Sequence, residues 1–567
     1  MPLKPALLGR LVLALACLLG LCGFVASTAS ATTFCVHTVA SQHCVGTAEP
    51  DLQTALTAAA TAPNDTHRNT VMVGNPGPPP GTGYTYNTAN PTTNPVDIVG
   101  AGQGTTTLTF SGGAASTVLT VYGDRSSVSN LRIVIPDTTG GTGLVLLGGG
   151  ASRVLVTSPG PQSQGLNGIF KLQGSSPTSP RSSLTQSAIT FPTSGTMSQL
   201  PIEVAVGSFV IDDRVTGQNT TSGGLLIVPP PSGYPKASTV RRVRVGTIPP
   251  SASSAFGMLV SGDGLTVNAD NLVLRVAGGT GTSFGAFVGS GATLNLNHAS
   301  VYGNADVEAS PASFGLSASA NAGQTTALNV RNSIIRNFFY ATYQQAHGAS
   351  AVANVRYDYS DYDFIHQLDA NTSGGTGAIT RGTGNLNDAD PGWPNPVAGD
   401  FRLPAGSLVI NKGDPALLNP LRESTTDILG HPRISGLRRD MGAVEFQFPP
   451  PRFKLLTGLF DPSNGKVRLP ARCKQPAGDR CRFNLTLKAK LKGKVNGKTK
   501  HKKVKLHLHG SAAGGKIVTL AGKLPSKVLP LIASATKLKF AVSGTVTDNA
   551  AAVAVATGHA TLKAASI

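Results

Sequence analysis

A phrase of alternating apolar and polar residues recurs four times between Leu265 and Tyr362. Its copies start at residues 265, 294, 328 and 353, and they read LTVNADNLVL, LNLNHASVYGN, LNVRNSIIRNF and ANVRYDYSDYD. The starts are 29, 34 and 25 residues apart, which is too short for βαβ units with their helices. Self-similarity at this period is typical of stacked repeats. We therefore expect each copy to form one coil of a parallel β-solenoid, since stacking buries the apolar side that a single coil leaves exposed.

The composition of the 567-residue chain suits a fold with many tight turns. Aromatic residues make up 5% of the chain and charged residues 13%, whereas Gly alone numbers 67. Small residues supply the backbone conformations that repeated turns need. The short alternating runs of Val, Leu and Ile argue against a disordered chain of biased composition.

The N-terminus has the pattern of a secretion signal. Lys4 and Arg10 precede an apolar run, and Ala29-Ser30-Ala31 is a small-x-small cleavage site, so residues 1–31 are predicted to be a signal peptide. The apolar run is too short for a membrane span. A lipoprotein anchor at Cys22 is disfavoured because the preceding Leu21 is bulky. We expect a secreted or cell-surface protein with no membrane span after cleavage.

Four cysteines remain after the signal, in two sequence-local pairs: Cys35 with Cys44, and Cys473 with Cys481. In an oxidising compartment each pair is predicted to form a disulfide. His37 and His43 flank the first pair, which leaves a zinc site as the alternative. The short Cys-x2-4-Cys spacing of zinc sites is missing.

Residues 32–64 are predicted to form an N-terminal cap. The segment from Asp51 to Thr61 is Ala-rich, and its apolar residues recur at helical spacing, at Leu52, Ala55, Leu56 and Ala59. A short amphipathic helix of this kind covers the open end of a solenoid, whose first coil would otherwise expose its core.

Two stretches resemble a known family. The sequence TALTAAA, then VMVG, YTYN and VDIVGAGQGTT, resembles the opening of right-handed parallel β-helix proteins of the pectate-lyase-like superfamily. From Gly384, GNLNDADPGWPNPVAGDFRLPAGSLVINKGDP and TTDILGHPRISGLRRDMGAVEF resemble the closing segment of secreted bacterial β-helix proteins. The chain departs from that pattern at Leu408–Asn411. The resemblance implies a bacterial extracellular protein with a right-handed parallel β-helix over residues 65–447, including a closing segment at 384–447.

This superfamily hosts lyases, hydrolases and proteins without activity, so the fold implies no reaction. The Arg-x-Pro-x-x-Arg segment of pectate lyases is absent, and of the polygalacturonase-like motifs only an Asp-Asp occurs, at Asp212-Asp213. Adjacent residues of a strand point to opposite faces, so we interpret this pair as solvated surface. We lean toward a protein without enzymatic activity; the alternative is a polysaccharide lyase or glycoside hydrolase.

The phrase from Tyr357 to Asp363 is rich in acids and tyrosines. On an extended strand Asp361 and Asp363 would share a face about 7 Å apart, which suits an inverting glycosidase or Ca²⁺ ligation. No other cofactor is indicated. Tyr357, Tyr359 and Tyr362 are candidate sugar-stacking residues. The alternative is that these rings seal the last coil and the acids are solvated outside it.

Other polar residues of the repeats are predicted to be structural. Asn271, Asn297 and Asn332 fall near the strand turns, where asparagine satisfies backbone groups or forms ladders along a β-helix. His298 and His347 have no matching nucleophile pattern, and structural roles are favoured for both.

Charge is concentrated at the C-terminus. Residues 448–452 form a Pro-rich linker, and from Arg452 onward the chain has 23 basic and 3 acidic residues, against 24 and 25 in the rest. Short strand patterns over residues 453–567 predict a small Ig-like β-sandwich. The basic character therefore belongs to this module.

Lysines alternate with apolar residues around Val495-Asn496-Gly497-Lys498, a strong hairpin turn. Alternation places the lysines on one sheet face: Lys488, Lys490, Lys492, Lys494, Lys503 and Lys505. A solvated face is the simplest interpretation, yet such a charge repels itself, and a polyanionic partner would offset the repulsion. We expect an extracellular polysaccharide or an anionic envelope polymer as partner. Specific nucleic-acid recognition is not expected, because no stacking aromatic residues lie among the lysines.

Overall fold

The computed structural model describes residues 31–62, 68–88, 94–111, 117–136, 141–157, 170–173, 182–190, 202–205, 209–212, 215–220, 223–229, 232–233, 236–247, 254–277, 281–420, 423–475, 479–549 and 553–565. Apart from residue 31, the predicted signal peptide lies outside these residues, and so does Asp213 of the Asp-Asp pair. No helix in the described part of the chain has the length and apolarity of a membrane span.

The chain forms two compact units. The first comprises Met1–Ala389, Trp393–Phe401 and Asn419–Ser424, and the second comprises Asp390–Gly392, Arg402–Leu418 and Thr425–Ile567. The predicted closing segment therefore contributes to both units.

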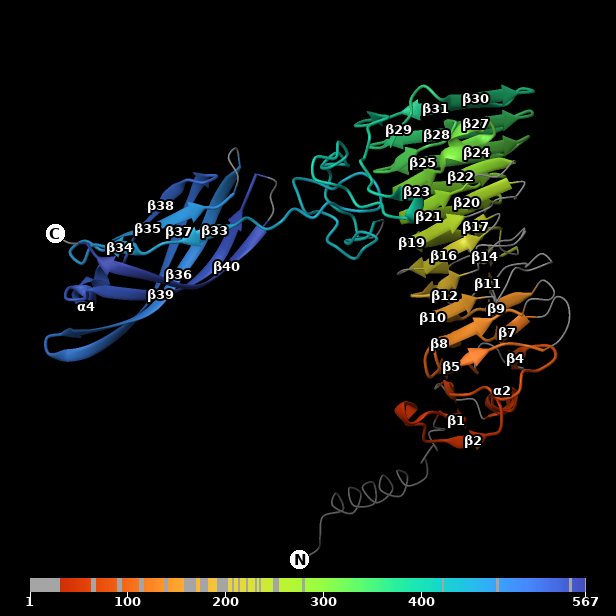
Figure 1. Ribbon diagram of the computed structural model, residues 1–567, viewed down its shortest axis with the longest axis horizontal. Helices are drawn as coiled ribbons and strands as arrows, with labels where there is room; N and C mark the ends of the chain where they lie inside the picture. The colour runs from red at the N-terminus through yellow and green to blue at the C-terminus, as the bar shows by residue number, and fades with distance from the viewer. Residues whose placement is uncertain are drawn as a thin grey trace, which may run out of the picture. The chain divides into compact units, whose positions relative to one another are not determined.

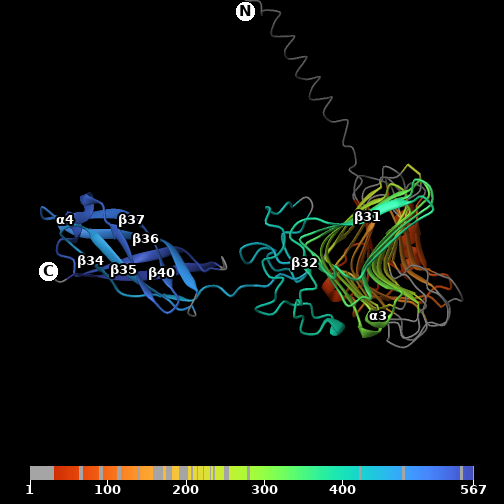
Figure 2. The same cartoon turned by 90° about the horizontal axis from the view of Figure 1, so that it is seen from above.

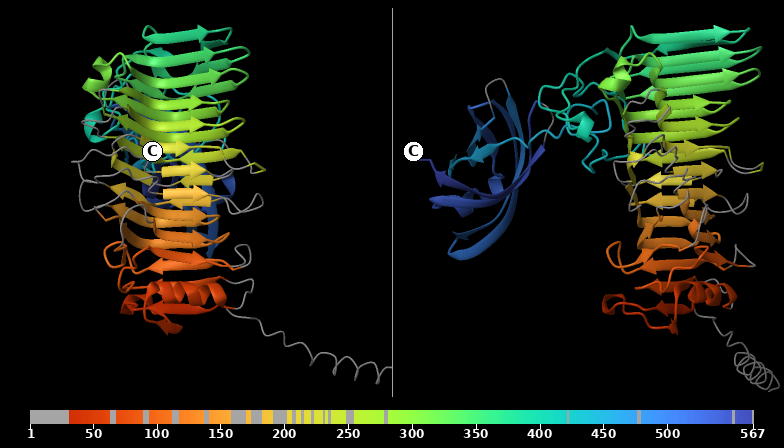
Figure 3. Two further views of the ribbon diagram at one scale, coloured as in Figure 1. Left: turned by 90° about the vertical axis from the view of Figure 1, so that its right-hand side faces the viewer. Right: turned by 45° about the vertical axis from the view of Figure 1, so that its right-hand side comes forward.

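The first unit is a parallel β-solenoid of about nine turns, which confirms the expected solenoid (Figures 1 and 3). Every strand pair in it is parallel, and successive coils overlie one another when viewed from above in Figure 2. Its 11-stranded sheet contains β4 (Tyr84–Asn87), β7 (Thr117–Tyr122), β9 (Thr142–Leu147), β11 (Phe170–Gln173), β14 (Ile202–Ala205), β17 (Gly223–Ile227), β20 (Ser254–Ser261), β22 (Thr282–Gly289), β24 (Ser313–Asn321), β27 (Tyr340–His347) and β30 (Gln367–Thr372).

Its 21-stranded sheet contains β1 (Thr33–Val36), β2 (Thr47–Glu49), β3 (Asn69–Val73), β5 (Val96–Gly100), β6 (Thr107–Leu108), β8 (Ser127–Val134), β10 (Gly150–Thr157), β12 (Ser182–Thr185), β13 (Ala188–Thr190), β15 (Phe209–Asp212), β16 (Val215–Thr220), β18 (Ala237–Arg241), β19 (Val243–Thr247), β21 (Thr266–Val276), β23 (Thr293–Gly303), β25 (Thr325–Arg331), β26 (Ile334–Arg336), β28 (Val352–Asp358), β29 (Asp361–Tyr362), β31 (Thr376–Arg381) and β32 (Leu386–Asn387). Three short helices also lie in this unit: η1 (Ala40–Gln42), α3 (Ala305–Ala309) and η2 (Pro396–Ala398).

The four recurring phrases form stacked coils, as predicted. They correspond to β21, β23, β25 with β26, and β28 with β29, and each pairs with the next. Leu294 pairs with Val267 and with Leu328, and Leu328 pairs with Val355. Aligning the copies at residues 265, 294, 328 and 353 therefore misplaces the first and last copies by two residues relative to the strand register. A shift of two keeps the same side chains on the core side of each strand.

Each of these coils bends at one residue with a left-handed backbone. The bends lie over one another along the solenoid, at Asn130, Arg153, Gln186, Arg242, Asn271, His298, Asn332 and Tyr359, with φ between 48° and 60°. Asn adopts this conformation more readily than other residues with a side chain. Asn332 donates to Asn297 at 2.9 Å, and Asn297 donates to Asp270 at 3.0 Å, so two of the three predicted asparagines form a ladder that continues through Asp270 rather than Asn271.

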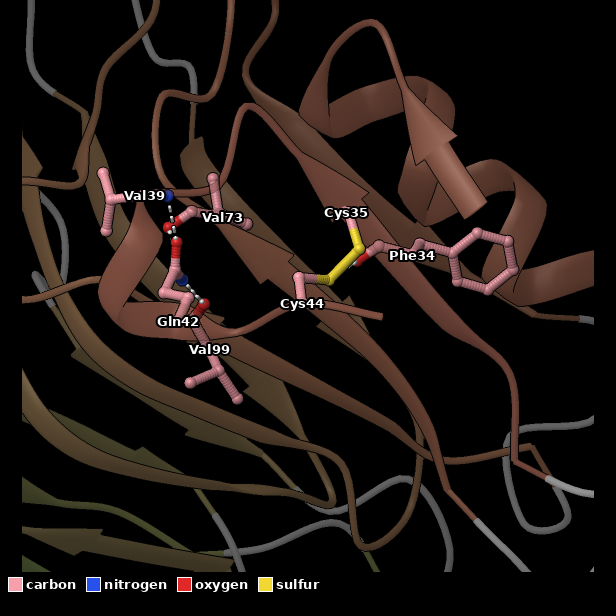
Figure 4. The surroundings of a disulfide bond; sticks show 7 residues. All are labelled: Phe34, Cys35, Val39, Gln42, Cys44, Val73 and Val99. Atoms are coloured by element: carbon pink, nitrogen blue, oxygen red, sulfur yellow. Dashed lines mark hydrogen bonds between the residues drawn. A yellow bond between two sulfur atoms is a disulfide. The ribbon is translucent and has the colours of Figure 1, made fainter. Parts of the chain in front are cut away.

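The N-terminal cap contains the predicted helix, α2 (Leu52–Thr61), whose first turn is capped by Asp51 accepting from the Thr54 amide at 2.9 Å. The four residues predicted from helical spacing, Leu52, Ala55, Leu56 and Ala59, are those it buries. Cys35 and Cys44 form the predicted disulfide (Figure 4). Beside it, the Gln42 amide donates to the Val73 and Val99 carbonyls, which ties η1 to the first coils.

The part of the closing segment that belongs to the first unit packs along the line of bends. The Ser424 amide donates to Asp270 at 2.7 Å, and Glu423 lies 3.4 Å from His298. Both Asp270 and His298 are buried, so the segment satisfies polar groups that the coils leave at the corners. His298 therefore has a structural contact, as predicted.

The second unit contains a mixed eight-stranded sheet formed by β33 (Phe453–Leu455), β34 (Gly458–Phe460), β35 (Lys466–Cys473), β36 (Arg480–Val495), β37 (Lys498–Ala513), β38 (Ile517–Lys523), β39 (Lys537–Thr547) and β40 (Val553–Ala564). All pairs are antiparallel except β34 with β40. The short helices η3 (Ser526–Val528) and α4 (Leu529–Ile532) precede β39. The predicted disulfide between Cys473 and Cys481 joins β35 to β36. A separate apolar core lies beneath these strands.

Candidate polyanion-binding face

The β36–β37 hairpin is the longest pair of strands in the described part of the chain, with 16 residues in each (Figure 1). Its two-residue turn is Asn496-Gly497, both with positive φ, as the type I′ hairpin signal predicts. The neighbouring strand β39 pairs with β36 only from Arg482 to Lys488. The end of the hairpin that carries most of its lysines therefore extends beyond this pairing.

Alternation sorts the side chains of the hairpin between two faces. Leu485, Leu487, Leu506 and Leu508 are buried against the core of the second unit. The six lysines predicted for the other face are all exposed: Lys488, Lys490, Lys492, Lys494, Lys503 and Lys505. Burial of the leucines thus holds the lysines toward water, because successive residues of a strand point to opposite sides.

Strands β39 and β40 enlarge this charged face. Lys537 and Lys539 alternate with buried Leu538 and Phe540, and Lys563 lies opposite Lys537. We call the outward side of β36, β37, β39 and β40 the basic face, with nine lysines: Lys488, Lys490, Lys492, Lys494, Lys503, Lys505, Lys537, Lys539 and Lys563. Three of them were not predicted, because the sequence does not give the order of strands in the sheet.

Lysines lie directly opposite one another on this face. The register pairs Lys488 with Lys505, Lys490 with Lys503, and Lys537 with Lys563. Within the described residues, no carboxylate forms an ion pair with any lysine of the basic face. Like charges that face each other across a sheet are destabilising, so the fold gains nothing from these pairs. Another such pair, Lys466 with Lys523, lies on β35 and β38.

The paired lysines surround a shallow hollow. It has a volume of about 420 Å³ and is lined by Lys488, Lys490, Lys503 and Lys505 together with Ala489 and Val504. Four lysine side chains border it, and their positive charge suits an anionic group of a polymer better than a neutral one.

The two candidate catalytic acids lie in different surroundings. Asp361 is fully buried in β29, where it accepts from the Ala389 amide at 2.8 Å and lies 3.8 Å from the Arg336 guanidinium. Asp363 is partly exposed and accepts from the Ile365 amide at 2.7 Å. Partial burial raises the pKa of Asp363, but hydrogen bonds from His366 and from the backbone outweigh this effect and hold the pKa below its usual range. Both carboxylates therefore have structural partners, and their catalytic role or Ca²⁺ ligation stays a prediction.

The three candidate sugar-stacking tyrosines also differ in exposure. Tyr357 and Tyr362 are fully buried and stack on each other with ring centroids 3.8 Å apart. Burial raises the pKa of both hydroxyls, to about 12 for Tyr362. Tyr359, at the bend, is partly exposed, and the Arg331 guanidinium lies over its ring at 6.0 Å. A sugar would reach Tyr357 or Tyr362 only if the coil opened, so ligand binding by these rings also stays a prediction.

The comparisons with known proteins add no assignment. No protein-family model matches the chain, and no curated protein matches it in sequence.

Proposed function

We propose that the protein binds extracellular polyanions through the basic face of its C-terminal module. The observation that carries the proposal is the set of directly opposed lysine pairs, Lys488 with Lys505, Lys490 with Lys503 and Lys537 with Lys563, without acidic partners among the described residues. A linear polymer that carries sulfate, phosphate or carboxylate groups would relieve their repulsion. Binding of this kind is electrostatic and weakens with salt.

Protection of a sheet edge is the main competing explanation. Lysines on an edge strand discourage pairing with another chain, and β37 is such an edge. However, at Lys488 strand β36 pairs with β37 on one side and with β39 on the other, so this lysine does not lie on an edge. Edge protection therefore accounts for only part of the set.

The rest of the proposal rests on the sequence. The signal-like N-terminus and the resemblance to the pectate-lyase-like superfamily support a secreted or cell-surface bacterial protein, whose solenoid displays a face for carbohydrate. The basic face would then retain it on an anionic envelope or matrix. A lyase or glycosidase that uses Asp361 and Asp363 is the enzymatic alternative, and release of reducing sugar from a polyuronide would support it.

Removal of the central lysines tests the proposal. The full chain should bind dextran sulfate at 50 mM NaCl, and the variant Lys488→Gln/Lys490→Gln/Lys503→Gln/Lys505→Gln should bind about 600-fold more weakly, from about fivefold per lysine near an anionic surface. The matched control, Lys466→Gln/Lys474→Gln/Lys516→Gln/Lys523→Gln, removes the same charge from elsewhere in the module. Equal losses in the two variants would mean that net charge, rather than the basic face, governs binding.

A further inference from the structure

Four of the chain's 11 histidines lie in the C-terminal module: His501, His507, His509 and His559. All four are exposed. The strand register places them on the basic face: His501 lies opposite Lys492, His507 opposite Thr486, His509 opposite Asn484, and His559 opposite Ala541. Every histidine of the module therefore lies on the face that carries the lysines.

Among the described residues, the strand register places only neutral and basic groups next to these histidines. His501 lies between Lys492 across the strand and Lys503 along it. The Nδ1 atom of His507 is 3.0 Å from the Thr486 hydroxyl, and Lys505 is the next outward residue on its strand. His509 is the outward residue between His507 and Ser511, and Arg482 lies opposite Ser511.

The strands packed against these positions add no acid. His559 lies diagonally from Lys539 and Ser543 of β39, and β34, on the other side of β40, has no titratable residue. Strand β38 packs against the apolar side of β37. Leu508 of β37 lies so close to Gly522 of β38 that a side chain at position 522 would collide with it. The three acids of the module, Asp461, Asp479 and Asp548, lie outside the four strands of the basic face.

We infer that polyanion binding by the basic face is graded by pH, with the four histidines adding positive charge as the pH falls. This inference rests on the proposed function and names its regulation. A water-exposed imidazole becomes cationic over the range in which pH falls from about 8 to 5, whereas lysine keeps its charge throughout. No carboxylate on the face neutralises the added charge, so each proton taken up strengthens attraction to a bound polymer. The protein would hold an anionic matrix more tightly where the surroundings are mildly acidic.

The test measures binding of the full chain to dextran sulfate at pH 8.0 and 5.5 at a constant 50 mM NaCl. The sulfate esters stay ionised at both pH values, so only the charge of the protein changes. We expect the affinity of the wild type to rise about 25-fold or more at the lower pH, as two or more added charges provide at about fivefold each. The affinity of the variant His501→Gln/His507→Gln/His509→Gln/His559→Gln should change less than about twofold between the two pH values.

A second variant tests the same idea in the opposite direction. Replacing the same four residues by Lys should give, already at pH 8.0, the affinity that the wild type reaches at pH 5.5. His347→Gln, at an exposed histidine of the solenoid, is the control and should keep the full pH response. A wild type with no pH response, or a four-Gln variant that retains it, would overturn the inference. Absence of binding at either pH would instead overturn the proposed polyanion binding itself.

Discussion

Single residues at the solenoid bends adopt a conformation that most side chains resist. Asn130 has a φ of 57°, and its neighbours in the stack include Arg153 with a φ of 53°. For residues other than Gly the left-handed region costs roughly 1–2 kcal/mol, with Asn and Asp tolerating it best. The stacked coils therefore impose the left-handed conformation on residues that disfavour it.

Asn130 gives a clean test, since none of the described residues forms a hydrogen bond with its side chain. Asn130→Val should destabilise the solenoid by about 1–2 kcal/mol, because a β-branched side chain is strained at positive φ, whereas Asn130→Gly should be nearly neutral. Urea unfolding of the full chain followed by far-UV circular dichroism would measure both. The neighbouring Ser129→Val, on extended backbone in β8, is the control and should change little. Equal midpoints for the Val and Gly variants at position 130 would show that the bend is unstrained.

The bend also explains why the tyrosines could not be placed from the sequence. A continuous strand would put Tyr357, Tyr359 and Asp361 on one face. Instead the left-handed residue Tyr359 resets the alternation, so that Tyr357 and Tyr362 both point into the core. Asn271 and Asn332 were predictable as turn residues from their chemistry, whereas Tyr359 was not, because its conformation follows from the coils stacked on it.

At the scale of elements, the closing segment buries four ionisable side chains alongside apolar ones such as Val409 and Met441. Arg433, Asp427, Asp440 and Glu445 are all buried. The Arg433 guanidinium donates to two backbone carbonyls and lies 3.8 Å from Glu445. The carboxylates accept hydrogen bonds from backbone amides. The Glu445 amide donates to the Asp427 carboxylate at 3.0 Å, and the Phe446 amide donates to the Asp440 carboxylate at 2.7 Å. These four residues are the charged positions of the family-like phrases DILGHPR and DMGAVE. The sequence therefore indicated the segment, but only the structure gives the reason for its acids.

Crowding of the carboxylates predicts an unusual pH dependence. Burial raises the pKa of both Asp440 and Glu445, and repulsion from Asp440 adds to the rise at Glu445. Because the folded segment holds these protons more tightly than the unfolded chain, unfolding releases protons between about pH 4 and pH 8. Stability of the segment is therefore full below this range and falls as the pH rises through it.

Hydrogen exchange at residues 425–446 of the full chain would measure this dependence. Protection, corrected for intrinsic exchange rates, should decrease between pH 5 and pH 8, and Glu445→Gln should flatten the decrease because its side chain has no proton to lose. Glu308→Gln, at an exposed site in α3, should leave the curve unchanged. Protection that increases with pH would contradict the assignment of raised pKa values.

Only part of the basic face could be predicted from the sequence. The β36–β37 hairpin was predictable because its turn and its alternating lysines are contiguous in the sequence. Lys537, Lys539 and Lys563 join the same face through pairing of β36 with β39 and of β39 with β40. That pairing joins strands far apart in the sequence, which no local pattern encodes.

At the scale of the whole molecule, charge is divided between nearly neutral and strongly basic parts of the chain. From Arg452 onward basic residues outnumber acidic ones by 23 to 3, while the rest of the chain has 24 basic and 25 acidic residues. Attraction to a polyanion should therefore come almost entirely from the C-terminal module, and its dependence on salt should report how many of its charges are engaged.

The slope of the logarithm of the association constant against the logarithm of salt concentration gives that number, at roughly 0.7–0.9 for each engaged charge on a nucleic-acid polyanion. If the basic face binds dextran sulfate along its paired lysines, removal of Lys488, Lys490, Lys503 and Lys505 should reduce the slope by about 3. The control variant at Lys466, Lys474, Lys516 and Lys523 carries the same net charge and should keep a slope close to that of the wild type. Measurement of the full chain between 50 and 300 mM NaCl, with uncharged dextran as a blank, would separate the two cases. Equal reductions in slope would mean that the polymer wraps the module without preference, and the opposed lysines would then have no special role.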